Sequence, residues 1–126
     1  EVYDIVIDCT TDNDLMYILD NLQLKSDIIN ISITNHANAL LCAFKPNIYQ
    51  FVMNQFDNIL ENDVEDMYNP TGCWNPTFKA SYNDINLLVQ MAIKKINFIY
   101  ENDIKKNSFV IKPDWTKQMA LKIDEY

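Results

Sequence analysis

The chain has 126 residues, of which 48% are hydrophobic, and this is enough for one domain with a core of its own. A formal net charge of −8 and the absence of arginine argue against binding to a nucleic-acid backbone, which requires many basic side chains. No stretch reaches the roughly 18 apolar residues of a membrane span. We therefore expect a single domain over residues 1–126 without direct nucleic-acid or membrane contacts.

Residues 3–9 predict a half-buried strand, because apolar and polar side chains alternate along them. Asp4 and Asp8 share one face, so that face is expected to meet water, as in an antiparallel or mixed sheet. The other face is predicted to be the buried one and carries Tyr3, Ile5, Ile7 and Cys9.

A helix is predicted to follow this strand, with Thr11 as its N-cap and Asp14 at the spacing of a capping box. Asp12 and Asp14 also lie in its first turn, where the helix dipole favours negative charge. Apolar residues at positions i, i+3, i+4 and i+7 predict a core-facing side made of Leu15, Ile18, Leu19 and Leu22.

The next segments predict two strands and a second helix. Alternating isoleucines indicate a strand over 29–34, and the apolar run 39–44 indicates a central strand that ends at Lys45 and Pro46. Pro46 suits the first turn of a helix, whose apolar side is formed by Ile48, Val52, Phe56 and Ile59. The first half therefore predicts a β-α-β-β-α order, an α+β layout with helices over a small sheet.

The second half predicts a long helix over about 83–101, opened by Ser81 and Asp84 and apolar enough to be packed between layers. A short strand is expected over 108–112. Pro113 and Asp114 are then expected to begin a final helix that carries Trp115, Met119 and Ile123. The whole chain is predicted to be one α+β domain with a small antiparallel or mixed sheet.

Asp8, Asp12 and Asp14 are the candidate metal ligands of the sequence. Carboxylates that follow the carboxyl end of a strand are where α/β enzymes hold Mg²⁺. No glycine-rich phosphate loop follows them, so we favour helix capping and a solvated turn, with no metal and no other cofactor. The alternative is a divalent-metal-dependent enzyme with its acidic site at these three residues.

Cysteine chemistry is not favoured. His36 is the single histidine, and its predicted place in a hairpin loop makes a pair with Cys42 on the next strand awkward. Cys9, Cys42 and Cys73 have no framework spacing, which predicts reduced thiols in a cytosolic protein, with Cys9 and Cys42 buried. We assign no catalytic residue.

The segment 62–78 is the candidate partner-binding loop. It lacks periodicity, starts acidic and contains two prolines and the single glycine. Aromatic side chains on irregular loops are typical of recognition surfaces, and the predicted contact residues are Tyr68, Cys73, Trp74 and Phe78. The alternative is that Trp74 fills the core beneath a long connection.

Abundant Asn, Ile and Lys without any arginine indicate an AT-rich coding sequence, as in a large DNA virus or a protist. With no persuasive catalytic constellation, the sequence predicts a non-catalytic, intracellular protein-protein interaction domain, an accessory protein of a virus or a parasite. Two alternatives stay open. One is the metal-dependent enzyme, and the other is a subunit of a nucleic-acid machine that contacts its protein partners.

Overall fold

The computed structural model describes residues 3–33, 37–59, 81–114, 117 and 120–126. These residues form one mixed sheet of five strands together with three helices, which confirms the predicted α+β class. The strands are β1 (Ile5–Asp8), β2 (Asp27–Ile33), β3 (Leu40–Phe44), β4 (Phe109–Asp114) and β5 (Ala120–Glu125), and the helices are α1 (Asn13–Asn21), α2 (Ile48–Ile59) and α4 (Tyr82–Glu101).

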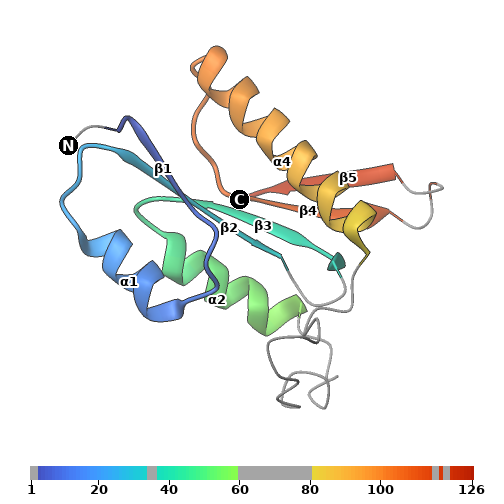
Figure 1. Ribbon diagram of the computed structural model, residues 1–126, viewed down its shortest axis with the longest axis horizontal. Coiled ribbons are helices and arrows are strands. Elements are labelled where there is room, and N and C mark those ends of the chain that lie inside the picture. The colour runs from blue at the N-terminus through green and yellow to red at the C-terminus, as the bar shows by residue number, and fades with distance from the viewer. Residues whose placement is uncertain (1–2, 34–36, 60–80, 115–116, 118–119) are drawn as a thin grey trace.

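The strands lie side by side in the order of the sequence, from β1 to β5. β1 and β2 are parallel, and every other neighbouring pair is antiparallel. α1 and α2 cover one face of the sheet and α4 covers the other, as Figure 1 shows. β1 and β5 are therefore the two edge strands of a sheet that has helices on both sides.

Two apolar cores lie on the two faces of the sheet, and β3 is buried along its whole length because it takes part in both. Under α4, the ring centroids of Phe44 and Phe109 lie 6.4 Å apart. The helix contributes its buried side there through Leu88, Ala92, Ile96 and Ile99. On the opposite face, strand residues Ile28, Leu41 and Val110 pack against Met16 of α1 and Ile48 and Val52 of α2.

α4 begins as the sequence predicts. The Ser81 hydroxyl accepts a hydrogen bond from the Asp84 N–H at 3.1 Å and donates one to the Asp84 carboxylate at 2.6 Å. The expectation that this helix is packed between layers is wrong, because Leu87 and Phe98 on its outer side are exposed. Among the described residues, α4 is alone on its face of the sheet, so no other helix covers that outer side.

The predicted orientation of the first strand is also wrong. Asp8 is buried, whereas Ile5 and Ile7 are exposed. Asp8 lies beside Asn30 on the face that α1 and α2 cover, and Ile7 lies beside Ile29 on the face of α4. Because α4 contacts mainly β3 and β4, the side chains of β1 on that face remain uncovered.

The final helix expected from Pro113 is wrong as well, because residues 120–125 form β5 instead. β5 pairs antiparallel with β4, and Leu121 and Ile123 pack against the core under α4. On the other face of the strand, Lys122 and Asp124 form an ion pair at 2.8 Å. Apolar and charged side chains thus alternate along residues 121–124, which is the period of a strand. Trp115 and Met119 of the expected helix lie outside the described residues.

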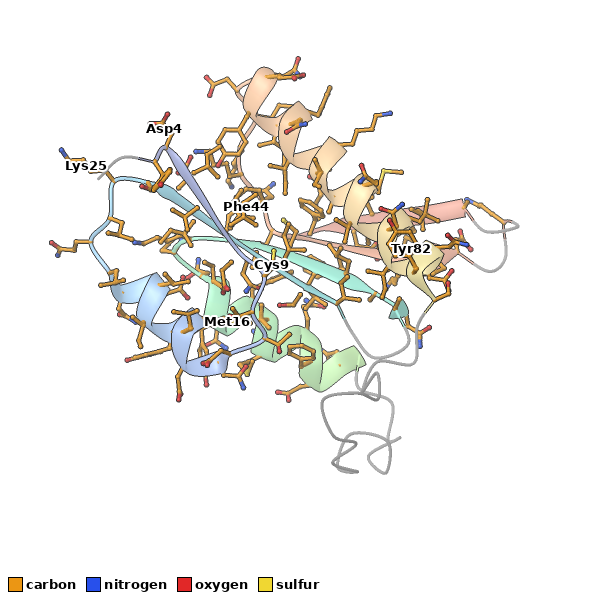
Figure 2. The ribbon with its side chains drawn as sticks, in the orientation of Figure 1. Asp4, Cys9, Met16, Lys25, Phe44 and Tyr82 are labelled. Carbon is orange, nitrogen blue, oxygen red and sulfur yellow. The ribbon has the colours of Figure 1, made fainter. Side chains whose placement is uncertain are left out.

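α1 is rotated relative to the prediction. Met16 is its buried residue and lies on the side that faces α2 (Figure 2). Of the predicted core side, Leu19 packs partly buried against the same core, whereas Ile18 and Leu22 are exposed. The rotation also directs Asp20 at α2, where its two carboxylate oxygens accept hydrogen bonds from the N–H groups of Ile48 and Tyr49 at 3.0 and 2.8 Å. Asp20 therefore caps α2, which begins at Ile48 and not at Pro46.

The N-cap of α1 is Asp12 and not Thr11, because the Asp12 carboxylate accepts a hydrogen bond from the Leu15 N–H at 2.9 Å. We therefore predict that Asp12→Ala lowers the free energy of unfolding by about 1 kcal/mol, the usual effect of losing an N-cap. Thr11→Ala is the matched control and should change it by less than about 0.5 kcal/mol. Urea unfolding measures both, and an equal loss in the two variants would contradict the assignment.

Candidate functional site

The outer edge of β1 carries backbone groups without partners among the described residues. The Asp27 N–H donates to the Asp4 carbonyl at 2.8 Å, which directs Asp4, and by alternation Val6 and Asp8, at β2. The N–H and C=O groups of Ile5 and Ile7 therefore point away from the sheet. Both side chains are also exposed, at 39% and 49% of their area. Among the described residues, β1 is therefore a free edge with apolar side chains on it.

Exposed hydrophobic side chains are frequent in the segment of the chain that contains this edge and α1. Within the described part of the chain, 13 large hydrophobic residues are exposed, and seven of them lie between residues 3 and 24. They are Tyr3, Ile5, Ile7, Tyr17, Ile18, Leu22 and Leu24. Clusters of this kind on a small domain mark interaction sites.

The apolar side of α1 points away from α2. Tyr17 and Asp20 are on the α2 side, since the Tyr17 ring meets the Tyr49 ring at 5.7 Å and Asp20 caps α2. Ile18 and Leu22 lie on the other side of the helix, where both side chains are exposed. We call Ile5, Ile7, Ile18, Leu22 and Leu24 the β1–α1 surface.

The charge near the carboxyl end of β1 is negative, whereas Lys106 lies beside its amino end, where it pairs with Asp27. The first 24 residues contain six acidic residues and no lysine: Glu1, Asp4, Asp8, Asp12, Asp14 and Asp20. Asp12 and Asp14 are exposed where β1 ends and α1 begins. Positive charge lies at the opposite end of α1, where the Lys45 ammonium donates to the Leu22 carbonyl. The acidic end of the β1–α1 surface is therefore the carboxyl end of β1.

A buried row of polar side chains fixes that end of β1. The Asp8 carboxylate accepts hydrogen bonds from the N–H and hydroxyl of Thr10, at 2.9 and 2.8 Å, and from the Asn30 amide at 2.9 Å. The Asn30 carbonyl oxygen in turn accepts from the Ser32 hydroxyl at 2.7 Å. These bonds hold β1, the following turn and β2 together across 22 residues of sequence.

The three acidic residues considered as metal ligands have separate roles. Both oxygens of Asp8 are engaged by Thr10 and Asn30, and Asp12 caps α1. In the parts of the chain that the structure describes, no three His, Cys, Asp or Glu side chains are grouped so that they could hold a metal ion. The expectation that Asp8 meets water is wrong, because its carboxylate is satisfied inside the fold.

The two described cysteines, Cys9 and Cys42, differ in their exposure to solvent. Cys42 is buried in the middle of β3, and burial raises the pKa of its thiol well above the usual range. Cys9 is exposed just after β1, so the prediction that it is buried is wrong. Both are free cysteines. His36 and Cys73 lie outside the described residues.

The predicted contact residues Tyr68, Cys73, Trp74 and Phe78 also lie outside the described residues, so that interface stays a prediction. The β1–α1 surface was missed because a stripe at i, i+3 and i+7 has the same period whether it faces a core or a partner. A second signal was present in the sequence, namely the complete lack of lysine before Lys25.

Asp27, Tyr100 and Lys106 form a small polar cluster beside β1. Asp27 is the first residue of β2 and pairs with Ile5 of β1. The Asp27 carboxylate accepts hydrogen bonds from the Lys106 ammonium and from the Tyr100 hydroxyl, the latter at 3.0 Å. The Lys106 ammonium also lies 4.9 Å from the centre of the Tyr100 ring. The hydrogen bond from Lys106 is the main cause that lowers the pKa of Asp27, and burial together with the bond to Asp27 raises the pKa of Tyr100.

The chain matches no protein-family model, and no curated protein is significantly similar to it. Within the described residues, no helix is long and apolar enough to cross a membrane. The function must therefore be inferred from the surface and the contacts of this chain itself.

The buried polar row predicts a large effect of a small substitution. Asn30→Ala leaves the Asp8 carboxylate without its amide donor and the Ser32 hydroxyl without its acceptor, so the free energy of unfolding should fall by about 3 kcal/mol. Ser32→Ala removes one neutral donor and should cost about 1 kcal/mol. Urea unfolding gives both values. A loss below about 1 kcal/mol in Asn30→Ala would show that the row is not a structural support.

The Asp27 cluster predicts a pH dependence. A carboxyl whose pKa is lower in the folded than in the unfolded state adds stability above its unfolded pKa, near 4, and that stability is lost as the pH falls through the folded value. The melting temperature of Asp27→Asn should therefore lie below that of the wild type near neutral pH, with a difference that shrinks as the pH falls below about 4. Asp57→Asn, on an exposed turn of α2, is the control. A pH-independent difference for Asp27→Asn would contradict this reading.

Proposed function

We propose that the chain is a non-catalytic protein-binding domain whose partner docks on the β1–α1 surface. The observation that carries the proposal is the concentration of exposed hydrophobic side chains in residues 3–24, which hold seven of the 13 in the described part of the chain, five of them in this surface. Apolar surface exposed to water is unfavourable, and burying it against a partner is a main source of binding free energy.

The acidic rim supports the same proposal. Asp12 and Asp14 lie exposed beside the apolar side chains, an arrangement in which an apolar centre is bordered by charge. Charge at the rim of an interface speeds association and selects partners of opposite sign. The proposed partner is therefore a protein with an apolar and basic surface.

A reducing, intracellular compartment is part of the proposal. Cys9 is an exposed free thiol and Cys42 a buried one. Exposed free thiols persist where glutathione and thioredoxin keep them reduced.

The test compares two double variants as baits in an extract of the cells that express the chain. Ile18→Gln with Leu22→Gln alters the β1–α1 surface, where the side chains are 50% and 43% exposed. Leu87→Gln with Phe98→Gln is the matched control on α4, where the side chains are 46% and 52% exposed. Both pairs keep the net charge and use a residue that forms helices well.

The first variant should bind the partner that the wild-type chain captures at least tenfold more weakly, which corresponds to about 1.4 kcal/mol of binding free energy. The control variant should capture it as well as the wild type does. Melting temperatures of both variants should stay close to that of the wild type, since the substituted side chains are exposed. Equal capture by the first variant and the wild type, or loss only in the α4 variant, would refute the docking site. Trp74→Ala in the same assay tests the predicted loop as a second contact.

A further inference from the structure

We infer that β1 is extended by a strand of the partner, and that this strand alternates apolar with basic residues. The inference rests on the proposed function and specifies how the partner binds at the same surface. In this mode an extended segment adds to the free edge of a sheet, with main-chain hydrogen bonds giving affinity and alternate side chains giving specificity.

The backbone of β1 is prepared for such pairing. Ile5 and Ile7 direct two N–H and two C=O groups outward, and no described residue bonds them. An added strand can satisfy all four groups. Their geometry is held by the buried row of Asp8, Asn30 and Ser32 behind them, which keeps β1 extended and fixed to β2.

The side chains on both faces of the edge also suit an added strand. On the α4 face, Ile5 and Ile7 are exposed and lie next to the positions that alternate residues of an added strand would take. On the opposite face, Val6 is half-buried and lies next to the positions that the other residues of an added strand would take. One set of apolar residues in the partner strand can therefore be covered without any movement of this chain.

The two edges of the sheet differ in a way that singles out β1. Natural sheets protect edge strands with lysine, other charges or proline. β5 follows that pattern with Lys122, Asp124 and Glu125, whereas β1 contains no lysine, no proline and a single charged residue, Asp8, that is buried. Apart from its length of only four residues, the free edge of β1 lacks these protective features.

The charges define the occupant. Three acidic residues are exposed near β1, namely Asp4, Asp12 and Asp14, and the sequence has no lysine before Lys25. Basic side chains in the added strand should therefore raise its affinity, and acidic side chains should lower it. A second copy of this chain is a poor occupant, because its own β1 brings the same acidic residues to the contact. The complementary strand carries lysine or arginine near the carboxyl end of β1.

The test uses ten-residue synthetic peptides with the full chain. One peptide alternates valine with lysine, a second alternates valine with glutamate, and a third is the lysine peptide with a central proline. Titration calorimetry measures affinity, and amide hydrogen exchange locates the contact. The lysine peptide should bind at least tenfold more tightly than either other peptide, and should protect the amides of Ile5 and Ile7.

Two variants test the mechanism. Ile7→Pro removes one outward N–H at an edge position that tolerates proline, and should lower the affinity for the lysine peptide at least tenfold. Ile7→Val keeps the N–H and should change that affinity less than about twofold. Asp12→Asn with Asp14→Asn removes charge but keeps a good N-cap, and should weaken the lysine peptide several-fold. Circular dichroism checks that each variant is folded, and the Asn pair keeps the test valid if Ile7→Pro unfolds.

Equal binding of the acidic peptide, protection on α4 in place of β1, or a β1-paired dimer of this chain would each overturn the inference. The capture assay separates its failure from that of the proposed function. If the captured partner is lost by the Ile18 and Leu22 variant but kept by Ile7→Pro, the docking site stands and the added strand does not. If that double variant loses nothing, the docking site itself is wrong.

Discussion

The structure depends on the burial of both faces of its central strand. Every residue of β3 is buried, so helices are needed above and below it, and α4 on one side and the α1–α2 pair on the other supply them. The helices contact mainly β3 and β4, so they cover the outermost strands less completely. The edge strands are less well covered because the helices are placed over the central strands. This placement determines which residues of the edge strands remain exposed.

The two edges resolve that shortage of cover differently. β5 keeps Leu121 and Ile123 partly buried under α4 and presents charged residues elsewhere, including Lys122 and Asp124. β1 instead buries its single carboxylate and exposes its isoleucines. The exposure is not a sign of a loosely held strand, since three hydrogen bonds to the Asp8 carboxylate hold its end in place. A rigid, uncovered apolar edge is what a binding surface requires.

The elements that local patterns define were predictable. The apolar run of β3, the alternation in β2 and the Ser81 cap of α4 are all set by neighbours in sequence. The errors concern residues whose environment comes from distant partners. Asp8 is buried because Asn30 reaches it, and β5 is a strand because β4 offers an edge. The candidate surface is hard to predict for the same reason, since Met16 and Leu19 of α1 pack against the core while Ile18 and Leu22 of the same predicted stripe are exposed.

The contact between Asp20 and α2 has a consequence for the order in which the chain folds. The first turn of α2 contains no acidic residue of its own, and the oxygens that accept its N–H groups come from a side chain 28 and 29 residues away. α2 therefore completes its amino-terminal turn when α1 docks, and α1 in turn gains its packing partner at that moment. The two helices form one cooperative unit, which opens and closes together in local unfolding, while α4, capped by its own Ser81, is independent of them at its start.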